Sequence, residues 1–181
     1  MRMFPILARA VTRIRILAAA AAAAAAAVVL SLGIAQLHAE QPVKISLLAT
    51  YFRNDNAQWI PTTDAEIQRM ADTRNTFTDL LSGSGKYELL LPDPSLQEAI
   101  DKSQRMGSCA GCEFRFGQQL GVEQGAWIEV QKVSELILNM NVYIGDVRRG
   151  QLTFVKSVDM RGNSDTSWER AIHYLVTNYL L

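Results

Sequence analysis

The sequence predicts a single α/β (α+β) domain, a two-layer or three-layer sandwich around a mixed sheet of about five strands. Two observations support this fold. Residues 126–144 alternate between apolar and polar side chains, which is typical of strands with one face toward water. Residues 168–180 instead repeat apolar side chains at intervals of three and four, which indicates an amphipathic helix. The full element order is β-α-β-α-α-β-β-β-α.

The first strand, helix and second strand form one unit. Val43–Phe52 is a mostly apolar run of strand formers, typical of a strand buried on both faces. Thr63 followed by Glu66 has capping-box spacing and predicts a helix that ends at residues 82–85. We expect its buried stripe to contain Ile67, Met70, Ala71, Phe77 and Leu81. Tyr87–Leu91 follows as a second strand, which we expect to be parallel to the first.

Two short helices come next, and we place them at Ser95–Met106 and Cys112–Leu120. A meander of three antiparallel strands then extends the sheet, with a turn at Asp146–Gly150 and Gln151–Met160 as its last strand. We expect the apolar positions of the middle strand to face inward, including Leu136. The three tryptophans are expected to act as core or sheet-face anchors; they are Trp59, Trp127 and Trp168.

The final helix is the most regular element of the sequence. Its apolar side chains run from Trp168 to Leu180 on one stripe. Asp165 or Thr166 is expected to cap it, because Thr166 and Glu169 have capping-box spacing.

Residues 1–39 have the features of a signal peptide. Four arginines and no acidic residue lie before an apolar run from Ile16 to Ala35, and we place cleavage after Ala39. An uncleaved anchor is the alternative, because about 20 apolar residues can span a bilayer. No cysteine lies near the cleavage point, so we do not expect a lipid anchor. We therefore expect Sec export to the periplasm, a globular domain at 40–181, and membrane contact only if the leader is retained.

The net charge depends on this leader. Its removal leaves 14 basic and 18 acidic residues, so the 142-residue domain carries a charge of −4 rather than zero. No basic patch favours nucleic acid as a partner. A domain of this length can bury a core of its own.

Cys109 and Cys112 are the only cysteines of the chain. Outside the cytoplasm they favour a structural disulfide, although closing so small a loop contributes only about 2 kcal/mol. A thiol–disulfide redox centre is the alternative, because a cysteine at a helix N-terminus has a lowered pKa. Glu113 replaces the histidine that c-type haem attachment requires, and ligands for zinc are too few, so we expect no cofactor and no metal.

The segment from Asp159 to Asp165 joins the last strand to the last helix and is rich in polar, turn-forming residues. Three interpretations stay open: a tight turn, a contact for a partner or ligand, and a cation site without EF-hand spacing. The candidate contact residues are Asp159, Arg161, Asn163, Asp165 and Trp168.

No group of residues has the pattern of a catalytic site. His173 is the only histidine after the leader, and no serine stands at a nucleophile elbow, so we expect a surface histidine and no enzyme. The Gly-Ser-Gly-Lys run at residues 83–86 follows a helix rather than a strand, which excludes a phosphate-binding P-loop.

Three blocks nevertheless resemble an exported proteobacterial family of unknown function. They are Ser108–Glu113, which includes C-x-x-C-E, then Gln131–Ser134 with Leu138–Val142, and Lys156–Asn163, which includes S-V-D-x-R-G-N. The element order also resembles the TolB N-terminal domain, CsgG and LpoB. This resemblance implies a role in protein contact in the cell envelope. We therefore expect a non-enzymatic interaction or accessory module with an envelope protein as its partner. The alternatives are a redox accessory acting through the cysteines, or sensing of a ligand or cation at the 159–165 loop.

Overall fold

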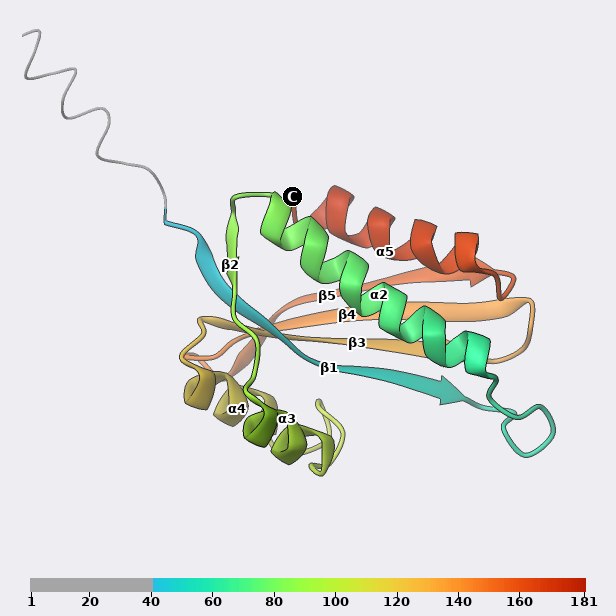
Figure 1. Cartoon of the computed structure of the whole chain (residues 1–181), viewed down its shortest axis with the longest axis horizontal. Coiled ribbons are helices and arrows are strands. Elements are labelled where there is room, and N and C mark those ends of the chain that lie inside the picture. Colours follow the sequence, from blue (N-terminus) through green and yellow to red (C-terminus); the bar gives the residue numbers. More distant parts are fainter. Residues whose placement is uncertain (1–40) are drawn as a thin grey trace, which may run out of the picture. The chain divides into compact units, whose positions relative to one another are not determined.

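The computed structural model describes residues 41–181, so the predicted signal peptide and its cleavage site lie outside the described residues. A single five-stranded sheet has the order β2-β1-β3-β4-β5 (Figure 1). Strand β1 is parallel to β2 and β3, whereas β3, β4 and β5 are antiparallel neighbours. The strands are β1 (Val43–Asn54), β2 (Tyr87–Leu89), β3 (Gln124–Lys132), β4 (Ile137–Asp146) and β5 (Gln151–Arg161). The mixed sheet and the predicted element order are confirmed.

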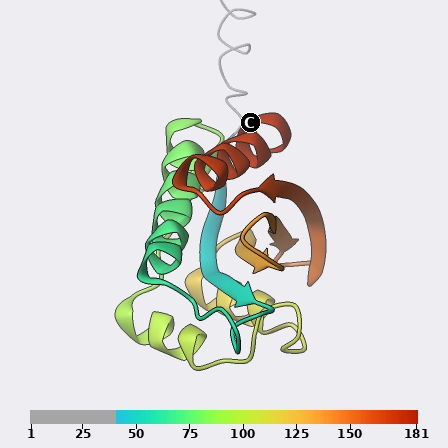
Figure 2. The same ribbon diagram turned by 90° about the vertical axis from the view of Figure 1, so that its right-hand side faces the viewer.

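Helices cover both faces of this sheet. The long helices α2 (Asp64–Gly83) and α5 (Asp165–Tyr179) lie side by side on one face (Figure 2). The short helices α3 (Pro94–Asp101) and α4 (Cys112–Leu120) lie on the other face (Figure 1). The domain is thus a three-layer sandwich. Among residues 41–181, no helix combines the length and the apolar character needed to cross a membrane.

The main core lies between the sheet and the pair α2 and α5. Phe77 and Leu175 from these helices are fully buried against Leu47, Val130 and Met140 of the sheet. Burying each such side chain stabilises the fold by about 1.5–3 kcal/mol. The alternating apolar positions of β4 supply much of this surface, as the period of two predicted.

A smaller core lies under α3 and α4. Leu48 and Trp127 are buried there, and the Trp127 ring stacks on Tyr143 with 5.1 Å between centroids. Helix α4 packs closely against Val147, because Gly117 has no side chain at the point of contact. Both faces of β1 and β3 are therefore buried along much of their length, while the polar side of β4 stays half-exposed.

Helix α2 presents a different stripe from the predicted one. Its capping box at Thr63 is confirmed. Ile67, however, is 61% exposed and Ala71 is exposed, whereas Glu66 and Thr73 are buried. A hydrophobicity pattern places apolar residues on the buried face of a helix. It does not predict that Glu66 is buried, because Glu66 pairs with a buried lysine of β3.

Several local predictions also differ from the structure. Helix α3 ends at Asp101 rather than Met106, and β2 is three residues long. Ser164, not Asp165 or Thr166, caps α5, because its hydroxyl accepts a hydrogen bond from the Ser167 N–H. Leu136 and Trp59 are 73% and 77% exposed, because they lie in the connections β3–β4 and β1–α2 rather than in strands.

Candidate functional site

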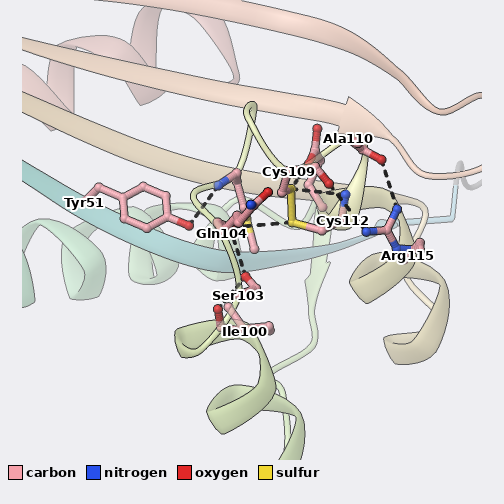
Figure 3. Close-up of a disulfide and its surroundings, with 10 residues drawn as sticks. Tyr51, Ile100, Ser103, Gln104, Cys109, Ala110, Cys112 and Arg115 are labelled. Carbon is pink, nitrogen blue, oxygen red and sulfur yellow. Dashed lines mark hydrogen bonds between the residues drawn. A yellow bond between two sulfur atoms is a disulfide. The ribbon is translucent and has the colours of Figure 1, made fainter.

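A disulfide joins Cys109 and Cys112 at the N-terminal end of α4 (Figure 3). Both cysteines are buried, at 6% and 5% exposure, and they pack in the smaller core beside Met106. The loop between them includes Ala110 in the left-handed region, with φ of 53°, a conformation that costs a non-glycine residue about 1–2 kcal/mol. Arg115 donates a hydrogen bond to the Ala110 carbonyl at 3.0 Å. The disulfide therefore holds an irregular segment against the sheet.

Glu113 is the unexpected member of this site. Its side chain is 6% exposed, and a carboxylate oxygen lies 3.0 Å from the Cys109 Sγ. No donor from residues 41–181 forms a hydrogen bond with this carboxylate, because a disulfide sulfur carries no hydrogen. The Glu113 oxygen and both sulfurs lie within 4.8 Å of one another. While the disulfide is formed, however, neither sulfur offers the thiolate that binds zinc.

A second buried polar site lies on the opposite face of the sheet. The Lys132 Nζ at the end of β3 is 2.5 Å from the Glu66 Oε1 of α2, and both side chains are 1% exposed. Lys132 also pairs with Glu135, which is 54% exposed. Because an unpaired charge inside a protein costs several kcal/mol, these three residues stabilise one another only as a group.

Asn163 connects this group to α5. Its amide Nδ2 donates to Glu66 Oε1 at 2.7 Å and to Glu135 Oε2 at 3.0 Å. Its Oδ1 accepts from the Trp168 indole N–H at 2.9 Å and from the Arg69 guanidinium at 3.2 Å. We call the set Glu66, Arg69, Lys132, Glu135, Asn163, Asp165 and Trp168 the Asn163 network. It holds the β5–α5 loop to the first turns of α2.

The charges of this network shift the pKa values of its members. Burial by itself raises the pKa of the Glu66 carboxyl, but hydrogen bonds from Lys132, Thr63 and Asn163 outweigh it and hold the pKa below its usual value. Burial likewise lowers the pKa of Lys132, and its bonds to Glu135 and Glu66 reverse that effect and raise it. The ion pair is therefore the favoured state at neutral pH.

The structure brings some of the five candidate contact residues together and separates others. Asn163, Asp165 and Trp168 belong to the Asn163 network, where Arg69 Nε donates to Asp165 Oδ1 at 2.7 Å. Trp168 is 1% exposed, so its ring supports the loop from inside. Asp159 and Arg161 lie on β5 and are exposed. Both line a hollow of about 700 Å³, together with the exposed Leu136 and Ile137.

Four residues of the Asn163 network were not predicted as site residues from the sequence: Glu66, Arg69, Lys132 and Glu135. Glu66 was expected only as a capping residue, and Glu135 carried no expectation. Lys132 lies inside the Gln131–Ser134 block that indicated the family resemblance, and that block was the one available signal. A single sequence does not show which glutamate meets which lysine, since 66 residues separate Glu66 from Lys132.

Comparison with known proteins gives a family but no activity. A family model described as "Protein of unknown function (DUF2380)" and named DUF3280 matches residues 43–180. The chain belongs to the DUF3280 family. The match covers all strands of the sheet and confirms the predicted membership of a family of unknown function. No curated protein matches this DUF3280 chain in sequence.

Several solved structures are similar to the DUF3280 domain. The LpoB C-terminal domain from Salmonella enterica is 10% identical, with a TM-score of 0.46 over 71% of this chain and 90% of that one. Lipoprotein GNA1162 from Neisseria meningitidis is 15% identical, with a TM-score of 0.47 over 77% and 100%. TolB from Acinetobacter baumannii is 16% identical, with a TM-score of 0.40 over 77% and 29%. LpoB and TolB are thus found by the comparison, as the sequence resemblance predicted.

Proposed function

We propose that this DUF3280 protein is an exported, non-enzymatic accessory module of the bacterial envelope that acts by binding another protein. One observation carries the proposal. Leu136 and Ile137 are 73% and 60% exposed beside Asp159 and Arg161, around the hollow at the end of β5. Exposed apolar side chains with a polar rim are typical of protein contact surfaces.

The Asn163 network supports this interpretation. It anchors the loop that follows Arg161, and the Gly162 N–H donates to the Leu136 carbonyl at 3.1 Å. The contact residues therefore stand on a rigid base, which reduces the entropy lost on binding. The Glu66–Lys132 ion pair at the centre of the network is buried, which suits support of a surface better than chemistry on a substrate.

Two measurements test the proposal. Mass spectrometry of the protein recovered from its host should show an N-terminus at Glu40. An intact leader would instead indicate that the leader is retained as a membrane anchor. A photo-crosslinking residue placed at Leu136 should capture an envelope protein, whereas the same residue at Lys102, directly after α3, should not. Equal capture at both positions, or none at Leu136, would contradict a contact surface there.

A second candidate function is thiol–disulfide exchange, and Glu113 is the observation that favours it. A partner dithiol would reduce the Cys109–Cys112 disulfide to two thiols and would itself become a disulfide. The new Cys109 thiol could donate a hydrogen bond to Glu113, which lies 3.0 Å from its sulfur and has no donor among residues 41–181. An unpaired buried polar group costs about 1–3 kcal/mol, so reduction relieves that cost.

The reduction potential of the disulfide separates the two functions. A reduction potential of about −200 mV would support exchange, and a potential below about −300 mV would indicate a structural disulfide. Glu113→Gln should lower the potential if the carboxylate favours the reduced form. An unchanged potential would show that Glu113 has no such role.

A further inference from the structure

The two edges of the sheet differ in how they are protected. Edge strand β2 has three residues, whereas edge strand β5 has eleven. Strand β4 pairs with one side of β5 over the full length of β4. No strand within residues 41–181 pairs with the outer side of β5. Natural proteins protect such edges with prolines, lysines, bulges or short strands. Strand β5 has no proline and one lysine, and its one irregularity lies near its start.

A hollow follows this open edge on the side of α5. It has a volume of about 480 Å³, and Val158, Met160 and Ala171 give it an apolar floor. Tyr174 stands on its rim and is 46% exposed. Alternate side chains of a strand added to β5 would point toward this hollow, because side chains alternate between the faces of a sheet.

Cationic side chains surround the same edge. Arg161 and Arg170 line the hollow, and Lys156 lies earlier on β5 with its Nζ 4.7 Å from the Tyr179 ring centroid. All three are exposed, and none forms an ion pair with a carboxylate of residues 41–181. Asp159 is the one acid lining the hollow, and it accepts a hydrogen bond from Asn139 at 2.8 Å. The edge of β5 is thus locally positive.

We propose that the outer edge of β5 binds an extended, acidic segment of a partner protein as an additional strand of the sheet. Backbone groups of the segment pair with β5, its apolar side chains enter the hollow beside α5, and its carboxylates meet Lys156, Arg161 and Arg170. This inference rests on the proposed protein-binding function and specifies the partner's chemistry. Pairing of β5 with a second copy is disfavoured, because it would bring the same three cations of both copies together.

Two short peptides test the edge directly. The first is an acetylated and amidated octapeptide of alternating valine and glutamate, and the second replaces glutamate by lysine. The protein, purified from the envelope of its host, should bind the glutamate peptide and not the lysine peptide in fluorescence anisotropy. Amide hydrogen exchange of β5 should slow only with the glutamate peptide. Equal binding of both peptides, or no protection of β5, would overturn the proposal.

Charge reversal separates local from overall electrostatics. Arg161→Glu with Arg170→Glu should weaken binding of the glutamate peptide about tenfold. Lys102→Glu with Arg148→Glu is the matched control, since it changes the net charge equally at exposed positions away from the hollow. Equal losses in both double variants would show that net charge alone drives binding and would overturn the proposal.

Proline at successive positions tests the backbone pairing. In an antiparallel edge strand, the N–H groups of neighbouring residues point alternately to the partner strand and to solvent. One of Ser157→Pro and Val158→Pro therefore keeps the pairing with β4 and removes an outward donor. That variant should stay folded by circular dichroism and lose the peptide. Unchanged peptide binding by this folded variant would contradict strand addition.

Two further outcomes distinguish this inference from the proposed function. Crosslinking at Leu136 without peptide binding would leave the protein-binding function standing and overturn the edge proposal. A dimer in light scattering that disappears in the folded proline variant would assign the edge to a second copy, and that result would also overturn it.

Discussion

Two irregular segments lie against opposite faces of the same sheet, and different chemistry holds each of them. The 102–111 segment before α4 is fastened by the Cys109–Cys112 disulfide. The β5–α5 loop is fastened by the Asn163 network and its buried Glu66–Lys132 ion pair. A covalent bond responds to redox conditions and an ion pair to pH. The comparison shows how one small domain can stabilise two surfaces independently.

The largest expected effect comes from breaking the ion pair on one side. Lys132→Met removes the amine and leaves the buried Glu66 carboxylate with its charge unpaired. We expect the free energy of unfolding at neutral pH to fall by about 3–5 kcal/mol, measured by urea denaturation. The double variant Glu66→Gln with Lys132→Met should lose less than the sum of the two single changes. A loss below about 1 kcal/mol for Lys132→Met would mean that the network contributes little.

The same network predicts an acid dependence of stability. The pKa of Glu66 is lowered on folding, so its contribution is present above the unfolded value of 4.5 and lost as the pH falls through the folded value. Urea unfolding from neutral pH to below 4.5 should show this loss. The double variant at Glu66 and Lys132 should have a shallower dependence, and parallel curves would assign the acid sensitivity to other carboxylates.

Removing the disulfide should have a smaller effect. Cys109→Ala with Cys112→Ala should lower the free energy of unfolding by about 2 kcal/mol, because the closed loop is very short. Adding reductant to the wild-type protein should produce the same loss, and the double variant should not respond to it. A response of the variant to reductant would show that the effect does not come from this bond.

The smallest effect concerns the start of α5 and its observed cap. Ser164→Ala should cost about 1 kcal/mol, because the Ser167 N–H loses its side-chain acceptor, the Ser164 hydroxyl. Thr166→Ala, at the position that the sequence pattern favoured, should stay within about 0.5 kcal/mol. Thermal denaturation of both variants compares them directly, and the opposite ranking would restore the predicted cap.

The order of the elements and much of the core could be predicted because periodicity is a local property. The alternation in β4 and the 3–4 spacing in α5 identify the buried faces of both elements without knowledge of their neighbours. The same reasoning failed for Ile67 and Glu66, since a hydrophobicity pattern does not include a pairing partner 66 residues away. The cysteine pair was predicted as a disulfide from its count and expected compartment, but Glu113 beside it was not.

The sequence by itself determined the element order, the capping box at Thr63 and the family blocks, because short-range spacing encodes them. Only the tertiary structure decided which polar groups are buried together. Asn163 joins the first turns of α2 and α5 to the β3–β4 connection, because both helices begin at the end of the sheet where β3 ends. The open edge of β5 is likewise a result of strand order. Long-range packing sets both features, and no local pattern of residues specifies it.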